Sequence, residues 1–326
     1  MNPFERIKEF GIIPVIKIPD ESLAEPLAQA LIAGGLPLIE ITLRNNCAIA
    51  CIKRVKKTFP EMCVGAGTVL TVTQAEAAKE AGADFVVAPG FDSDIVEYCK
   101  KIKMPFLPGC VTPSEIAKGL NNGFKILKFF PSECLGGVKT IKELCGPYQE
   151  ISFVATSGIN MDNLGEYMAC NKVAAVGGSF VAPAAMIQKK DWDGITALSK
   201  KAVEISLGFH LAHIGINNRN AIEGAKTAQR FSQILGIPYI SGNRSDFAGD
   251  IVESCKEKFP GTAGHIAIGT LSVERAVVYL KQKGFSIRDE FVGRDSDGKL
   301  KAVYLKDEVA GFALHLLRTT KYKSFC

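Results

Sequence analysis

The sequence predicts a two-domain α/β chain, in which a (β/α)8 TIM barrel is followed by an α+β domain of two paired βαβββ units. Three observations lead to this prediction. Short apolar runs alternate with amphipathic stretches over about residues 12–206, the alternation stops after Leu207, and a weak internal repeat follows. We therefore expect a barrel domain at 1–206 and a second domain at 208–326, with the boundary near Ser206–Gly208.

Composition excludes several classes of protein. The 326 residues are 47% hydrophobic and 22% charged, and no apolar run approaches the roughly 18–20 residues of a membrane helix. Ten cysteines are spread along the chain without a CxxC pair, which favours reduced thiols. Residues 1–207 are neutral overall, so the net charge of +5 comes from the residues after 207. The basic residues there form no dense run of the kind that binds nucleic acid. We expect a cytoplasmic protein that binds neither nucleic acid nor membrane.

Eight strand signals alternate with eight helix signals in the first 206 residues. Such alternation implies a parallel sheet, and its count matches a barrel whose active site lies at the C-terminal ends of the strands. The expected strands are IIPVIKI (12–18), LIEITL (38–43), CVGAGT (63–68), DFVVAP (84–89), PFLPGC (105–110), ILKFFP (126–131), ISFVATSG (151–158) and VAAVGGS (173–179). Expected helices include Leu23–Ala33, Ile49–Thr58, Gln74–Ala81, Asp94–Lys101 and Pro113–Leu120.

Polar residues inside apolar strands are the candidates for chemistry. In LIEITLR, period-two alternation places Glu40 and Arg44 on the face opposite Ile39 and Ile41, so they point into the barrel mouth. By the same rule Lys128 in ILKFFP points inward. An amine among Phe and Leu side chains loses hydration, which favours its neutral, nucleophilic form.

These two side chains suggest imine chemistry. Lys128 is a candidate Schiff-base nucleophile, and Glu40 is a candidate proton carrier. The alternative is a buried Lys128–Glu40 ion pair that only stabilises the barrel. A further alternative is a non-catalytic phosphate binder in which Lys128 is inert.

A carboxylate site and a phosphate site are also expected. The guanidinium of Arg44 suits a carboxylate, and Thr68 adds a hydroxyl donor; alternatively, Arg44 is a surface loop residue. The last two strands place small residues and backbone amides where barrels often hold a phosphate, although their glycines could also form tight turns. The candidates at this end are Thr156, Ser157, Gly158, Gly178 and Ser179.

The motifs EITLR, VGAGTVL, APGF, LPGCVTPSE, LKFFPSE, GGVK and AVGGSFVAP, in this order, resemble the 2-keto-3-deoxy-6-phosphogluconate / 4-hydroxy-2-oxoglutarate aldolase family over about residues 5–205. The resemblance implies a class I lyase that cleaves a small-molecule 4-hydroxy-2-oxo acid to pyruvate and an aldehyde, with no cofactor in the barrel. Position by position, it makes Lys128 the Schiff-base lysine and Glu40 the acid/base. Arg44 and Thr68 would hold the pyruvyl carboxylate, and Pro89 and Phe130 would wall the pocket. A homotrimer is also implied.

Two positions depart from the pattern of that family. Thr156-Ser157-Gly158 stands where Thr-Gly-Gly is usual, and Lys17 stands where an arginine is common in the first strand. Both departures bear on phosphate preference and leave the imine chemistry unchanged.

The second domain contains a repeat with one histidine in each copy. HIGIN (His213–Asn217) and HIAIG (His265–Gly269) each precede a helix, and His315 lies in the expected last strand FALHLL, after a turn at Asp297–Gly298. The neighbours on the same strand face are mostly small, which suits the floor of a cavity.

These strands resemble the vicinal oxygen chelate superfamily over about residues 209–319. The resemblance implies metal positions on the first and last strands of each unit, which are His213, Glu253, His265 and His315. Such ligands suit Zn, Ni, Fe or Mn. The alternative is a metal-free module that binds an effector or a partner.

Overall fold

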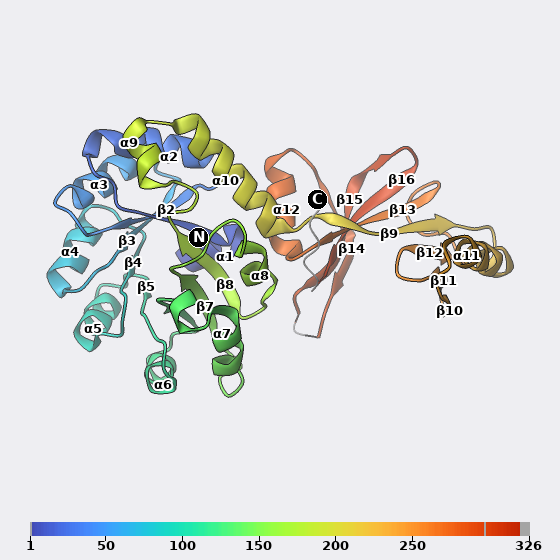
Figure 1. Ribbon diagram of the computed structural model, residues 1–326, viewed down its shortest axis with the longest axis horizontal. Coiled ribbons are helices and arrows are strands. Elements are labelled where there is room, and N and C mark those ends of the chain that lie inside the picture. Colours follow the sequence, from blue (N-terminus) through green and yellow to red (C-terminus); the bar gives the residue numbers. More distant parts are fainter. Residues whose placement is uncertain (1, 297, 320–326) are drawn as a thin grey trace. The chain divides into compact units, whose positions relative to one another are not determined.

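The chain forms two compact units, residues 1–206 and 207–326 (Figure 1). The computed structural model describes residues 2–296 and 298–319. No helix in these described ranges is long and apolar enough to span a membrane.

The first unit alternates strands and helices. The parallel strands are β1 (Ile12–Ile16), β2 (Leu38–Thr42), β3 (Cys63–Gly67), β4 (Phe85–Val87), β5 (Phe106–Leu107), β6 (Ile126–Phe129), β7 (Ser152–Thr156) and β8 (Val173–Gly178). The helices are α1 (Pro3–Phe10), α2 (Ala24–Ala33), α3 (Ala48–Thr58), α4 (Val72–Glu80), α5 (Ser93–Lys101), α6 (Pro113–Asn121), α7 (Gly137–Cys145), α8 (Leu164–Ala169), α9 (Ala184–Lys189) and α10 (Trp192–Leu207), with short 3-10 helices at Glu21–Leu23 and Glu133–Leu135.

The parallel sheet closes on itself. Its strands run in the order β5-β4-β3-β2-β1-β8-β7-β6, and the seam between β5 and β6 is bridged by the backbone of Lys128. The amide of Lys128 donates to Pro108 (2.8 Å), and its carbonyl accepts from Cys110 (2.9 Å). The predicted (β/α)8 barrel is confirmed.

Helix starts follow their capping residues. The side chains of Thr71, Asp92 and Thr112 accept hydrogen bonds from the first turns of α4, α5 and α6, which satisfies amides that the helix itself leaves open. The five predicted helices agree with the observed bounds to within one or two residues at each end.

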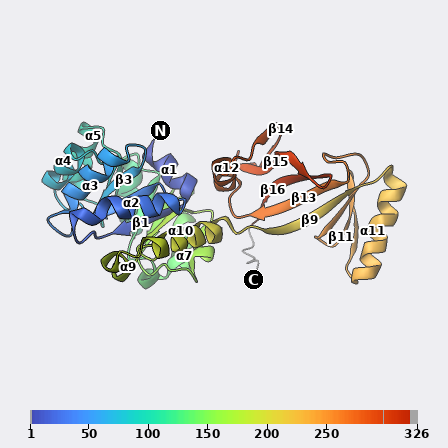
Figure 2. The same ribbon diagram turned by 90° about the horizontal axis from the view of Figure 1, so that it is seen from above.

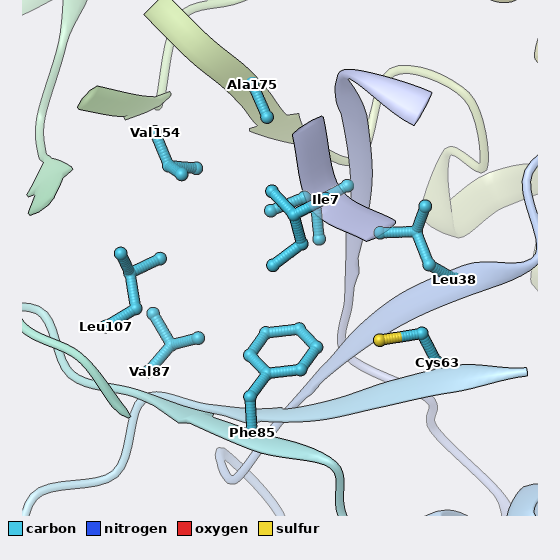
Figure 3. Packing of buried hydrophobic residues seen from close by; sticks show 9 residues of the cluster. Ile7, Leu38, Cys63, Phe85, Val87, Leu107, Val154 and Ala175 are labelled. Atoms are coloured by element: carbon cyan, nitrogen blue, oxygen red, sulfur yellow. The ribbon is translucent and has the colours of Figure 1, made fainter. Parts of the chain in front are cut away.

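The barrel interior is packed, and helix α1 closes one end of it. Ile7 from α1 lies among the inward-facing residues of the strands, including Leu38, Phe85 and Leu107 (Figure 3). Phe4 and Phe10, also from α1, pack against this cluster. This role of the N-terminal helix was not predicted from the sequence. Apolar side chains thus fill this layer of the barrel interior. The polar side chains of the barrel mouth lie beyond it, toward the C-terminal ends of the strands.

The second unit consists of two βαβββ halves. The first half comprises β9 (His210–Asn217), α11 (Ala221–Leu235), β10 (Tyr239–Ser241), β11 (Ser245–Ala248) and β12 (Val252–Cys255). The second comprises β13 (Gly264–Thr270), α12 (Val273–Gln282), β14 (Ile287–Arg294), β15 (Leu300–Val309) and β16 (Phe312–Arg318). Of the turn predicted at Asp297–Gly298, Asp297 lies outside the described residues.

The two halves join through their first strands. The described strands form one mixed sheet in the order β10-β11-β12-β9-β13-β16-β15-β14, with β9 and β13 antiparallel at its centre. Helix α11 packs on the strands of the first half and α12 on β15 and β16 (Figure 2). On β16, Leu316 is fully buried, and its neighbour His315 points to the opposite face because side chains alternate along a strand.

Candidate functional site

Lys128 and Glu40 meet inside the barrel mouth. The Lys128 Nζ atom lies 3.4 Å from Glu40 Oε1, and the two residues are 6% and 1% exposed. The amine also lies 5.7 Å from the centre of the Phe130 ring. Strands β2 and β6 are distant in sequence, and barrel closure brings these two side chains together. An amine and a carboxylate in contact, shielded from water, can exchange a proton directly.

Glycine on the neighbouring strand makes room for the carboxylate. A Cβ atom at Gly67, on β3, would overlap the Glu40 carboxyl group. Gly177 on β8 likewise makes room for Thr156, because the Thr156 methyl group occupies the space that a Cβ at Gly177 would need. The hydroxyl of Thr156 is buried and has no hydrogen-bond partner among the described residues; the residue also lines the cavity that contains Lys128.

Arg44 and Thr68 stand at the rim. The Arg44 Nε donates to the Thr68 hydroxyl at 3.3 Å, and Thr68 adopts a left-handed backbone conformation (φ 57°). Arg44 lines the same cavity as Lys128 and Glu40. A guanidinium and a hydroxyl at the mouth, beside the amine, can hold a carboxylate next to a reacting carbonyl.

A cavity of about 310 Å³ collects most of the predicted barrel residues. Besides Lys128 and Glu40, its walls include Arg44, Phe130, Thr156, Ser157, Gly158, Gly178 and Ser179. Val15, Ile159 and Gly177 also line it and were not predicted from the sequence.

Two of the expected residues do not themselves line this cavity. Thr68 reaches the cavity only through Arg44, and Pro89 is not among the residues that line it; the Pro89 carbonyl instead packs against Gly109. Lys17 is exposed just after β1 and does not line the cavity either.

The turn after β7 is strained at Ser157. Its φ of 83° lies in the left-handed region, which a non-glycine residue adopts at a cost. Gly158 follows with φ 80°, and a Cβ there would overlap the Glu133 side chain. This turn therefore brings its backbone close to the Glu133 side chain, an approach that glycine allows at position 158.

A hydrogen-bonded network that could not be predicted from the sequence lies behind that turn. The Tyr167 hydroxyl hydrogen-bonds the Glu133 carboxylate and lies 2.8 Å from the Ser132 hydroxyl. The Ser132 amide donates to the Thr156 carbonyl at 2.8 Å. Burial and the hydrogen bond to Glu133 raise the pKa of Tyr167 above its usual range. The motif LKFFPSE contains Ser132 and Glu133, but no sequence pattern links them to Tyr167.

In the second unit the three histidines and Glu253 converge on one face of the sheet. The ligating atoms of His213, His265 and His315 all lie within 4.8 Å of one another. His213 Nε2 lies 3.2 Å from both His265 Nε2 and Glu253 Oε2, and His265 Nε2 lies 3.3 Å from that same oxygen. These four residues come from β9, β13, β16 and β12.

The cluster is partly unsatisfied. Neither ring nitrogen of His315 has a hydrogen-bond partner of good geometry in the described part of the chain, and the same holds for His265 Nδ1. Buried polar atoms without partners are rare in folded proteins. A Cβ at Gly215 would overlap the His265 ring, so the floor of the cluster requires glycine there.

Electrostatics favour the metal-binding forms of His315 and Glu253. Burial, followed by the neighbouring His265 and His213, lowers the pKa of His315 to about 3, so its imidazole is neutral near pH 7. Burial acts to raise the pKa of Glu253, but hydrogen bonds from His213, His265 and Ser245 outweigh it and hold the carboxyl ionised. Neutral imidazoles and a carboxylate are the forms in which these groups bind metals.

Comparisons with known proteins concern the barrel. The family described as KDPG and KHG aldolase matches residues 4–198. The 2-dehydro-3-deoxy-phosphogluconate aldolase of Treponema pallidum is 41% identical over 202 residues, which are 62% of this chain and 96% of that protein. The KHG/KDPG aldolase of Escherichia coli K12 is 40% identical over 193 residues, or 59% and 91% of the two chains.

A solved structure agrees with this assignment. The KDPG aldolase of Legionella pneumophila, with pyruvate captured as a covalent carbinolamine, superimposes with a TM-score of 0.60 at 37% identity, covering 62% of this chain and 98% of that one. The sequence match covers more than half of the chain, including all eight strands of the barrel. The chain therefore belongs to the KDPG and KHG aldolase family and is an aldolase, a carbon–carbon lyase.

Proposed function

We propose that the barrel cleaves 4-hydroxy-2-oxo acids, such as 4-hydroxy-2-oxoglutarate and 2-keto-3-deoxy-6-phosphogluconate, through an imine on Lys128. The other product is glyoxylate or glyceraldehyde 3-phosphate, according to the substrate. The observation that carries this proposal is the Lys128 amine, buried 3.4 Å from the Glu40 carboxylate in a cavity that also contains Arg44.

The reaction follows from these groups. The Lys128 amine adds to the C2 carbonyl, and Glu40 supplies the proton with which the hydroxyl leaves as water, giving the imine. Glu40 or a water then accepts the proton of the C4 hydroxyl while the C3–C4 bond breaks. The electron pair of that bond moves into the protonated imine, leaving an enamine and releasing the aldehyde. Protonation at C3 and hydrolysis release pyruvate. Because the imine accepts the electron pair, the step requires no metal.

Binding groups are assigned to the two ends of the substrate. Arg44, supported by Thr68, would hold the carboxylate next to C2. The Ser157–Gly158 turn and Gly178–Ser179 would hold the far end, where one substrate carries a phosphate and the other a carboxylate. Phe130 would form an apolar wall beside the amine.

Borohydride trapping tests the nucleophile. Reduction in the presence of pyruvate should attach a three-carbon acid to Lys128, and Lys128→Ala should lose both the adduct and cleavage. The matched control Lys79→Ala, at an exposed lysine of α4 outside the cavity, should keep both. An adduct on another lysine would contradict the assignment.

We further propose that the second unit holds one divalent transition metal, Zn, Ni, Fe or Mn, through His213, Glu253, His265 and His315. The fold resembles the vicinal oxygen chelate superfamily in its paired βαβββ halves. The donors fit: ligand atoms at about 2.0–2.1 Å from a tetrahedral zinc are roughly 3.3–3.4 Å apart, close to the 3.2–3.3 Å separations among His213, His265 and Glu253. A bound ion would also satisfy one orphaned nitrogen of His315.

Metal analysis tests this centre. Protein purified without chelator should contain about one transition metal per chain, lost in His213→Ala/His265→Ala while aldolase activity persists. His210→Ala is the control, because His210 is a buried histidine of the same strand that hydrogen-bonds the Gly208 carbonyl rather than joining the cluster. A metal-free wild type would favour the alternative, an effector-binding or interaction module.

The assembly is inferred from the family resemblance alone. We infer a homotrimer, for which light scattering should give three times the mass of the chain.

A further inference from the structure

A carboxylate lies directly behind the end of the barrel cavity that is proposed to bind an anion. The Cβ and Cγ atoms of Glu133 occupy the space that a Cβ at Gly158 would need, and Gly158 lines the cavity that contains Lys128. Glu133 is exposed and is not itself among the residues that line the cavity. A negative charge beside this turn opposes the binding of a phosphate or a carboxylate, so the direction in which the carboxylate points matters.

The Tyr167 hydroxyl holds this carboxylate. It donates a hydrogen bond to Glu133 Oε1 and lies 2.8 Å from the Ser132 hydroxyl. An ionised carboxylate can only accept hydrogen bonds, so the phenol proton points to Glu133 and the Ser132 hydroxyl donates to the phenol oxygen. Tyr167 is 1% exposed, and its raised pKa keeps the phenol protonated. The donors therefore run in one direction, from Ser132 through Tyr167 to Glu133.

The motif GGVK provides room for this contact. A Cβ at Gly137, the first residue of α7, would lie 2.8 Å from Glu133 Oε1 and 2.9 Å from the Tyr167 hydroxyl. The carboxylate thus lies at the N-terminus of α7, where the helix dipole favours negative charge. It is directed to Tyr167 and α7, behind the turn.

Backbone hydrogen bonds tie the same segment to the turn. The Ser132 amide donates to the Thr156 carbonyl at 2.8 Å, and the Glu133 amide donates to the Ser157 carbonyl at 3.3 Å. These bonds do not involve the Tyr167 hydroxyl. Loss of that hydroxyl would therefore release the Glu133 carboxylate and leave the backbone bonds of the turn in place.

We propose that Tyr167 is a positioning residue that determines specificity, because it keeps the Glu133 carboxylate turned away from the anionic end of the substrate. Without this hydrogen bond the carboxylate rotates beside Gly158, and its charge opposes a terminal phosphate or carboxylate. A unit charge at roughly 7 Å, in surroundings between protein and water, changes binding by about 3- to 10-fold. The inference rests on the binding of the far end of the substrate by the Ser157–Gly158 turn, as proposed above.

Specificity for a charged tail tests this role. The value of kcat/KM is measured for 2-keto-3-deoxy-6-phosphogluconate and for the same acid without its phosphate, and the ratio of the two values is the readout. Tyr167→Phe should lower this ratio by about 3- to 10-fold, mainly through KM of the phosphorylated substrate. The matched control Tyr148→Phe, which loses a hydrogen bond to the Pro113 carbonyl outside the cavity, should keep it.

Two further measurements separate charge from packing. Glu133→Gln in the Tyr167→Phe background should restore the ratio. Glu133→Asp keeps the charge but is too short to reach Tyr167, so it should lower the ratio with the tyrosine intact. The decrease in both charged variants, relative to wild type, should shrink as salt is added. Deuterium exchange into pyruvate, which needs the Lys128 imine but has no far end, should stay unchanged in all variants.

The outcomes distinguish this inference from the proposed function. If the wild type does not prefer the phosphorylated substrate, the assignment of the far end fails, and the role of Tyr167 fails with it. If the wild type has this preference but Tyr167→Phe and Glu133→Asp keep it, or if the decrease survives Glu133→Gln, only the role of Tyr167 is overturned.

Discussion

Replacing Glu40 by glutamine should slow turnover by a factor of roughly 10²–10⁴, the contribution of a positioned acid/base. This corresponds to about 3–5 kcal/mol of activation free energy. We expect a large decrease in kcat because Glu40 is buried. The residue is 1% exposed and touches the Lys128 amine, so bulk water cannot replace its carboxylate as proton carrier. Glutamine keeps the shape and removes the proton transfer.

A coupled enzyme assay of pyruvate release gives kcat. Borohydride trapping with pyruvate shows whether Lys128 still forms an adduct. We expect the adduct to persist in Glu40→Gln while kcat falls. Glu97→Gln, at an exposed position on α5, is the control. If Glu40→Gln keeps kcat within about threefold and instead loses thermal stability, the pair is structural and the assignment of Glu40 is wrong.

Three further substitutions follow from backbone geometry. Gly67→Ala should lower kcat by about 10²-fold although Glu40 is retained, since the new methyl group displaces its carboxylate; unchanged kcat would show that the position of the carboxylate is not critical. Ser157→Gly removes left-handed strain and should raise the ratio of kcat/KM for the phosphorylated six-carbon substrate over that for 4-hydroxy-2-oxoglutarate. An unchanged or lower ratio means that the Ser157 hydroxyl binds the phosphate or lies out of its reach. Gly215→Ala should lower metal content, because its methyl group overlaps the His265 ring, and should leave barrel activity unchanged; full metal content would contradict that packing argument.

The alternation of side chains along strands accounts for what the sequence could predict. In a barrel, period two fixes which residues face inward, so Glu40 and Lys128 could be placed in one mouth without coordinates. The same rule, applied to a repeat, placed His213 and His265 on equivalent strands. Their approach to within 3.2 Å depends on the antiparallel pairing of β9 with β13, which the repeat alone does not specify.

Contacts that depend on loop paths could not be predicted this way. Tyr167 meets Glu133 only because α8 returns to the end of β6, and no periodicity encodes that approach. Pro89 was predicted at the pocket by family resemblance; its carbonyl packs against Gly109, and the residue is not among those that line the cavity. Element positions are local properties of a sequence, whereas these contacts are set by tertiary packing.

One physical requirement is common to both units. A large polar side chain that lies flat on a sheet needs space above the neighbouring strand, and only glycine provides it. Gly67 does so for Glu40 in the barrel, and Gly215 does so for His265 in the second unit. The observed positions of the carboxylate and the imidazole therefore depend on glycine at these two sites, which is why an added methyl group is expected to displace each of them.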